Sequence, residues 1–244
     1  MHANSRLDAK VEIQEQLNLY YREELENAKS GFDEHALREL SVPQFLSVSS
    51  EYLESPVRVM FVGQETRGWI GRLAAYYDGL HGMDAVLGRY ERFIRTTSKV
   101  GAFVQTLRAV ESRLAAGRVG AVAYANLIKM DWKREGSDSR RSLEHSKHLC
   151  DLSVRLLQAE IRLLRPSVII FATGPTYDSL LKRALVDIRT IKVHVPRQLW
   201  EFEAAGALCM RVQHPQTRIQ SAKAQYPKMF DLIEARFPSV YAAG

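Results

Sequence analysis

The stretch "SLEHSKHLCDLSVRLLQAEIRLLRPSVIIFATG", residues 142–174, decides the fold class. Its first part, 142–166, carries the longest helical spacing of apolar residues in the chain, and Pro166 marks the helix exit. The run "SVIIFATG" (167–174) is continuously apolar and rich in β-branched residues, which is typical of an interior parallel strand. A similar run, "VGAVAYANLI" (119–128), precedes the helix, so the order strand, helix, strand predicts a βαβ unit.

Two more apolar runs extend this pattern on both sides. They are "VRVMFVG" (57–63), which follows Pro56, and "ALCMRVQHPQ" (207–216). Weaker patterns at 190–195 and 199–206 predict a hairpin or edge strands, and helices are expected over about 6–28, 83–116 with a break near 96–99, 176–185 and 219–236.

These patterns predict an α/β protein: a three-layer α/β/α sandwich with a mostly parallel central sheet of about four core strands, plus an N-terminal helix. We expect a single domain over 1–244, in which residues 1–50 form a helical extension packed on the rest.

The composition narrows the class of protein. Apolar residues make up 46% and charged residues 25% of the 244, an ordinary globular composition. No apolar run approaches the roughly 20 residues that cross a bilayer, and Met1 to Lys10 lacks a signal-peptide hydrophobic region. We therefore expect a soluble, cytoplasmic protein with no membrane partner, and a monomer.

The cysteine and histidine patterns predict neither a metal nor a cofactor. Cys150 and Cys209 have no CxxC spacing, so one chain cannot build a disulfide framework, a four-cysteine zinc site or a four-cysteine iron–sulfur cluster. HExxH-type spacing is also missing from the sequence.

The charge favours a polyanionic partner. The formal net charge is +6 and the sequence pI is near 9.3, which favours nucleic acid through counterion release. Arginine and lysine concentrate in "KREGSDSRR" (133–141) and "TRIQSAK" (217–223). Each cluster is equally well interpreted as a solvated loop.

Polar residues follow the apolar runs, where open α/β sheets bind ligands. Glu65 and His214 are far apart in sequence, but parallel strands would bring both to one edge. A carboxylate there could activate water or stabilise a cation, while an imidazole stabilises a departing anion. The amide of Asn126 offers a donor and an acceptor, which matches the edge of a nucleobase. Gly63, Gln64 and Gly174 complete this set.

Each residue also has a purely structural interpretation. Glu65 could be a solvated turn carboxylate or pair with Arg67, and His214 could be a core histidine held by a backbone carbonyl. Asn126 could satisfy a neighbouring turn. Trp69 and Trp132 could simply cover the sheet.

Four short motifs together resemble the uracil-DNA glycosylase superfamily. They are "VGQE" (62–65), "YANL" (124–127), "FATG" (171–174) and "VQHPQ" (212–216), in the family's order and at strand ends. The resemblance covers about 55–236 and implies cleavage of an N-glycosidic bond in DNA after the target nucleotide is flipped into a pocket.

The resemblance also implies a role for each residue. Glu65 would position water or stabilise the sugar cation, and His214 would donate a hydrogen bond to the leaving base. Substrate contacts would come from Gly63, Gln64, Trp69, Asn126 and Gly174, with Asn126 reading the base edge and Trp69 stacking on it. Contacts to the DNA would come from Arg67, Pro215, Thr217 and Arg218.

The chain departs from the family pattern at two places. Thr66 and Arg67 stand where better-known members have Pro-Tyr, and Gln216 stands where Ser is usual. These changes keep an alternative open, a non-catalytic protein on the same fold that binds nucleic acid, a nucleobase or a nucleotide. An unrelated α/β enzyme, such as a nucleotide hydrolase, is a third possibility, although GxSxG, GxxxxGK[ST] and GxGxxG are missing.

Overall fold

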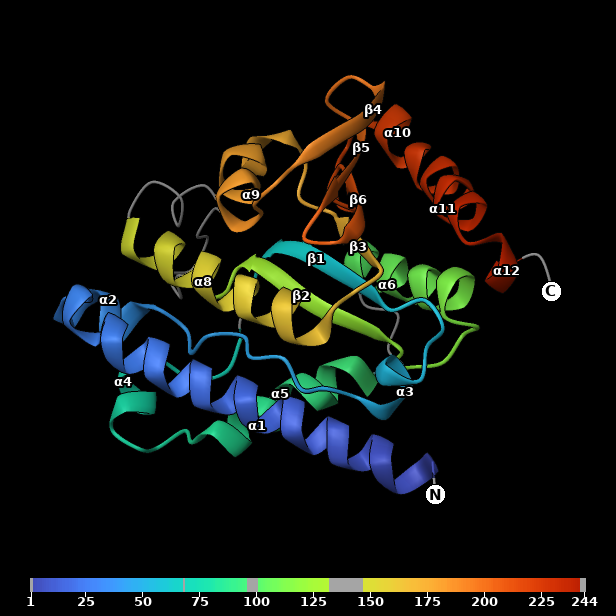
Figure 1. Ribbon diagram of the computed structural model, residues 1–244. Coiled ribbons are helices and arrows are strands. Elements are labelled where there is room, and N and C mark those ends of the chain that lie inside the picture. The colour runs from blue at the N-terminus through green and yellow to red at the C-terminus, as the bar shows by residue number, and fades with distance from the viewer. Residues whose placement is uncertain (1, 68, 96–100, 132–146, 242–244) are drawn as a thin grey trace.

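The computed structural model describes residues 2–67, 69–95, 101–131 and 147–241, with side chains from residue 8. Its centre is a sheet with the strand order β2-β1-β3-β6-β5-β4 (Figure 1). In that order the strands are β2 (Val122–Ile128), β1 (Val59–Glu65), β3 (Val168–Phe171), β6 (Ala207–Val212), β5 (Leu199–Ala204) and β4 (Arg189–Val195).

The four core strands are parallel, as the apolar runs predict. β1 pairs in parallel with β2 on one side and with β3 on the other, and β3 pairs in parallel with β6. All residues of β2, β3 and β6 are buried, which explains why their sequences are continuously apolar rather than alternating. β5 runs antiparallel to β6, and β4 runs antiparallel to β5, so the expected hairpin forms the far side of the sheet.

Helices cover both faces of this sheet. α8 packs on β2 and is itself covered by α1, while α11 packs on β6 and contacts α6. Figure 1 shows α1 beside α8, and α9 and α11 on opposite sides of the β4–β5 hairpin. The helices are α1 (His2–Ala28), α2 (Glu34–Glu39), α3 (Ser50–Leu53), α4 (Leu73–Tyr77), α5 (Met83–Arg95), α6 (Gly101–Leu114), α8 (Lys147–Leu164), α9 (Asp178–Ala184), α10 (Gln220–Lys223), α11 (Gln225–Arg236) and α12 (Pro238–Tyr241).

Several element boundaries differ from the predictions. The helix predicted at 219–236 is two helices, α10 and α11, which meet at Ala224. α2 and α4 are short helices that the sequence analysis did not predict. The break near 96–99, the basic cluster 133–141 and Trp132 lie outside the described residues.

The polar stretch after the first apolar run belongs to the strand. β1 continues through Gly63, Gln64 and Glu65, where Gly63 is in register with Asn126 and Glu65 with Ile128. Asn126 likewise does not end its strand, because β2 runs two residues further. The expected turn therefore begins at Thr66. The reason is that β1 and β2 extend side by side and satisfy each other's backbone hydrogen bonds.

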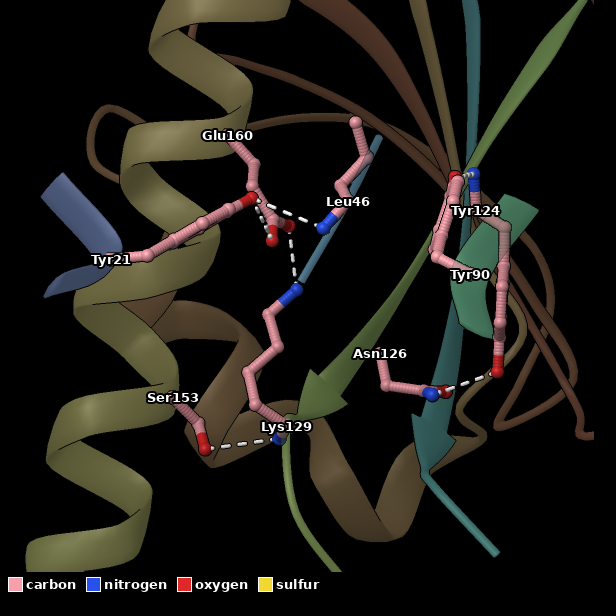
Figure 2. A network of polar contacts seen from close by, with 8 residues as sticks. All are labelled: Tyr21, Leu46, Tyr90, Tyr124, Asn126, Lys129, Ser153 and Glu160. Atoms are coloured by element: carbon pink, nitrogen blue, oxygen red, sulfur yellow. Dashed lines mark hydrogen bonds and ion pairs between the residues drawn. The ribbon is translucent and has the colours of Figure 1, made fainter. Parts of the chain in front are cut away.

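A fully buried ion pair joins the sheet to its helical cover (Figure 2). The Lys129 Nζ atom lies 2.5 Å from the Glu160 Oε2 atom, and both side chains are 0% exposed. The Tyr21 hydroxyl donates to Glu160 at 3.0 Å and accepts from the Leu46 backbone N–H at 3.2 Å. Burial raises the pKa of Glu160 and lowers that of Lys129. The pair thus fixes α1 and α8 against the end of β2.

No helix among the described residues is both long enough and apolar enough to pass through a bilayer.

Candidate active site

Hydrogen bonds join the carboxyl ends of β1 and β6 to the residues that follow β3. The Gln64 side-chain amide, from β1, donates to the Thr173 carbonyl at 2.8 Å. The Gly174 backbone N–H, after β3, donates to the Val212 carbonyl at the end of β6, at 2.9 Å. Glu65, Gly174 and His214 therefore lie at one edge of the sheet, with β3 between the other two strands.

Glu65 is the last residue of β1 and is half-buried. Arg67, two residues further along, is exposed, and its charge lowers the pKa of His214. A charge acts appreciably on a titrating group only at short range in a protein. The Arg67 charge therefore lies close enough to His214 to act on its titration.

His214 is a neutral hydrogen-bond donor at neutral pH. Its pKa is lowered to about 4, first by burial and second by the charge of Arg67. The Nδ1 atom accepts the backbone N–H of Gln216 at 3.2 Å, so in the neutral ring the proton is on Nε2. The ring can therefore stabilise an anion through Nε2–H.

Asn126 is buried, and only one of the two polar atoms of its amide has a hydrogen-bond partner among the described residues. Its Nδ2 donates to the Tyr124 hydroxyl at 2.7 Å, whereas its Oδ1 has no hydrogen-bond partner among the described residues (Figure 2). A Cβ at Gly63 would lie 2.4 Å from this Oδ1, so the strand needs glycine there because of close approach. A buried acceptor without a partner carries a desolvation cost of about 1–3 kcal/mol.

Phe103, near the start of α6, lies at the centre of this group. Its ring stacks against His214, with centroids 5.7 Å apart and planes 19° apart, and it also contacts Tyr124 at 5.3 Å between centroids. A Cβ on Gly63 would come within 3.0 Å of the same ring. The space between Gly63, Tyr124 and His214 is therefore occupied by a phenyl ring in this structure.

Sequence reasoning missed Phe103 and Tyr124. Phe103 belongs to a helical pattern, where an aromatic residue indicates core rather than a site. In the sequence, Tyr124 stands out only as a neighbour of Asn126 in "YANL". Neither sequence position reveals that both rings face Gly63, because this contact depends on how α6 packs on the sheet.

The turn after β1 is built around Asp131. The Thr66 hydroxyl donates to Asp131 at 2.7 Å, and the Trp69 backbone N–H donates to the same oxygen at 3.3 Å. Trp69 is only 6% exposed and packs against Phe93, with Arg89 over its ring. Thr66, one of the departures from the family pattern, thus fixes the turn. The ring next to His214 is that of Phe103.

Gly174 connects β3 to the short helix η2 (Pro175–Tyr177) and must be glycine. Its φ of 69° with ψ of 172° belongs to a region that essentially only glycine adopts. A Cβ there would also lie 2.8 Å from the Gln213 Oε1 atom. Pro175 at the first helical position agrees with the predicted strand, turn and helix order.

The residues of the loop after His214 differ in how exposed they are. Pro215 is buried, Thr217 is half-buried, and Arg218 is exposed. The Thr217 backbone N–H donates to the His214 carbonyl at 2.9 Å, which closes a tight turn. The exposed cations at this edge, Arg67 and Arg218, are available for contacts with phosphate.

No group of three or more His, Cys, Asp or Glu among the described residues is arranged to hold a metal ion. No protein-family model matches the chain, and no curated protein sequence matches it.

Proposed function

We propose that this protein is a DNA glycosylase-like enzyme that hydrolyses the N-glycosidic bond of a flipped, uracil-type base. The observation that carries the proposal is the neutral His214 at the same sheet edge as Glu65. A glycosidic bond breaks with build-up of positive charge on the sugar and negative charge on the base. A carboxylate and a neutral N–H donor at one edge match these two charges.

The chemical step balances with water alone. The bond between C1′ and the base nitrogen breaks, and its electron pair leaves with the base, stabilised by the His214 Nε2–H. Water adds to C1′ and loses a proton toward the Glu65 carboxylate, and the base ends as a neutral molecule after it takes up a proton. The products are the free base and an abasic deoxyribose.

Asn126 supports recognition of a base that carries a ring N–H. The hydrogen bond from Nδ2 to the Tyr124 hydroxyl orients the amide, and Oδ1, an acceptor with no partner among the described residues, can then meet a ligand. Uracil, thymine and other lactam bases offer a ring N–H to such an acceptor, whereas cytosine offers a ring acceptor at the same place. Tyr124 acts here as a positioning residue.

Phe103 must make room for a base. Its ring borders Gly63 and stacks on His214, so a base that reaches the Asn126 Oδ1 has to displace the ring or stack on it. Stacking of a flipped base on an aromatic side chain is a common mode of recognition. We propose Phe103 for this role in place of Trp69, which is buried.

Incubation with oligonucleotides containing one uracil tests the proposal. We expect abasic product that is cleaved by alkali, with large losses in the Glu65→Gln and His214→Ala variants. Glu15→Gln, which changes an exposed carboxylate on α1, is the matched control and should retain full activity. Removal of a single charge-stabilising donor lowers such rates by about 10²–10³. Absence of abasic product from single- and double-stranded substrates would reject the enzyme.

The position of Phe103 favours a second candidate, a protein on the same fold that binds nucleic acid without cleaving it. A ring that fills the space beside His214 would keep a base from the catalytic pair. This candidate predicts salt-dependent DNA binding that weakens in Arg67→Gln and Arg218→Gln, with no product. A Phe103→Ala variant that gains cleavage would instead identify the ring as the only obstacle.

A further inference from the structure

A second hollow lies at the opposite edge of the sheet from Glu65 and His214. This groove, with a volume of about 1320 Å³, is formed by the end of α8, the residues before β3, the end of α9 and the β5–β6 turn. Its lining includes Ser167 and Ala207, at the amino ends of the parallel strands β3 and β6. The candidate active site lies beyond the carboxyl ends of the same strands. The two regions are therefore separate.

The floor of the groove is apolar, and exposed apolar side chains follow it in the chain on the edge strand β4. Ile161, Leu185 and Leu208 line the floor. On the rim, Val186 is 65% exposed, and on the neighbouring edge strand β4 Val193 is 52% exposed. Among the described residues, three of the eight exposed large hydrophobic side chains fall within 186–193, the third being Ile191. Exposed apolar side chains that accumulate in one short segment indicate an interaction site more strongly than scattered ones do.

The rim carries more positive than negative charge. Arg162, Arg165 and Arg189 line it, against Asp187 and Glu203. Arg189 is paired with Glu203, so the remaining charges are two arginines and one aspartate. Arg162 lies over the Tyr20 ring at 5.6 Å from its centroid, which keeps its guanidinium beside the groove. The complementary partner is apolar and acidic.

The rim backbone is held in an unusual conformation at three points. Arg165, Asp187 and Ala205 have φ values of 46°, 57° and 51°, and they are three of the five non-glycine residues with positive φ in the described part of the chain. Asp187 is of a type that adopts this conformation readily, and Ala205 with Gly206 forms the two-residue β5–β6 turn, which requires positive φ at both positions. The conformation of Arg165 is unfavourable for its residue type.

We propose that this groove and the adjoining edge of β4 dock an acidic, apolar segment of another protein. The volume exceeds the 300–1,000 Å³ or so that is typical of small-molecule pockets. A second copy of this chain would bring a net charge of +6 against a basic rim. Strand pairing between two copies is also opposed by Lys192 on β4 and by the irregular β4 register at Thr190/Lys192 and Val193/Val195.

Synthetic fluorescein-labelled peptides provide the test. One peptide alternates leucine with glutamate, a second replaces glutamate with lysine, and a third replaces leucine with serine. Fluorescence anisotropy with the full chain should show saturable binding of the first peptide only, weaker at higher salt. Val186→Asp and Arg165→Glu should each weaken it at least about tenfold. Leu80→Asp, at a residue 74% exposed and outside the groove, is the matched control.

Three outcomes would overturn the proposal. One is equal affinity for the acidic and the lysine-containing peptides, and another is binding that Val186→Asp and Arg165→Glu leave unchanged. The third is a dimer in sedimentation equilibrium that Val186→Asp dissociates, since this result would assign the surface to a second copy. Circular dichroism melts of the variants should match the parent, because the changed side chains are on the rim. DNA binding should be unaffected, which separates this proposal from the proposed function.

Discussion

The imidazole of His214 lies nearly parallel to the phenyl ring of Phe103, with centroids 5.7 Å apart. This contact buries the imidazole, and burial is the larger of the two causes that lower its pKa to about 4. The packing of a helix on the sheet thereby keeps the imidazole of a loop residue neutral down to a pH well below the ordinary range for histidine.

Replacement of Phe103 by alanine should raise the pKa of His214 toward its ordinary value near 6.5, because water then reaches the ring. NMR titration of the imidazole resonances measures this shift. The variant should also lose about 3 kcal/mol of stability, near the low end for Phe→Ala because Phe103 is half-buried. Phe45→Ala, which truncates a ring stacked on Tyr21, should lose stability without moving the pKa. An unchanged pKa in Phe103→Ala contradicts the role of the contact.

Arg67→Gln should raise the pKa of His214 by less than Phe103→Ala does, since charge is the second cause and burial the first. The depressed folded-state pKa means that the unfolded chain binds the extra proton between about pH 4 and 6.5. Stability from His214 is therefore present above this window and lost as the pH falls through it. Arg67→Gln should raise the folded-state pKa of His214, and with it the lower end of this pH window. Denaturant titrations at a series of pH values measure the shift. Arg218→Gln, in the loop after His214, is the control and should leave it in place.

Gly63→Ala should destabilise the fold by about 1–3 kcal/mol, because the new Cβ would lie 2.4 Å from the Asn126 Oδ1 atom and 3.0 Å from the Phe103 ring. Urea unfolding measures the loss. Gly82→Ala is a matched control, since a Cβ at that exposed glycine meets nothing within 4 Å, and its effect should stay within about 0.5 kcal/mol. Equal stabilities of the two variants would show that the sheet relaxes freely around Gly63.

Lys129→Met should cost about 3–5 kcal/mol at neutral pH, because it leaves Glu160 buried without its cation. The pKa of Glu160 is already raised by burial, and loss of Lys129 should raise it further. A raised folded-state pKa contributes stability at low pH that is lost as the pH rises. The variant should thus be closer to the parent at about pH 5 than at about pH 8.

The double variant Lys129→Met with Glu160→Gln should recover much of that loss and show a flatter pH dependence. The exposed pair Arg38–Glu34 gives the control, since Arg38→Met should change stability by less than about 1 kcal/mol at either pH. If Lys129→Met loses more stability at acidic pH than at alkaline pH, its pH dependence would be opposite to the one expected from Glu160.

Tyr124→Phe should cost about 1–3 kcal/mol, because the buried Nδ2 of Asn126 loses the hydroxyl that accepts its proton. Tyr241→Phe removes a half-buried hydroxyl that donates to the Leu114 carbonyl, and it should cost less. If the variant cleaves or binds bases, its preference for ring N–H donors over ring acceptors should shrink, since the amide is then free to rotate. A preference that stays at the parent level would mean that Tyr124 does not set the amide orientation.

The order of apolar runs was enough to predict the parallel core of the sheet. Strands buried on both faces must be apolar throughout, and helical spacing between two such runs leaves a right-handed crossover as the simple connection. The same pattern located Glu65, Gly174 and His214 at one edge, because parallel strands end on the same side.

Only the tertiary structure decided the surroundings of those residues. Phe103 meets His214 across 111 positions of sequence, Tyr124 holds the Asn126 amide, and Asp131 ties the turn that carries Thr66. Local periodicity indicates which face of an element is buried, but not which side chain of another element it meets. That choice follows from the packing of α6 and of the loops against the sheet, and burial and neighbouring charge then set the chemistry of each group.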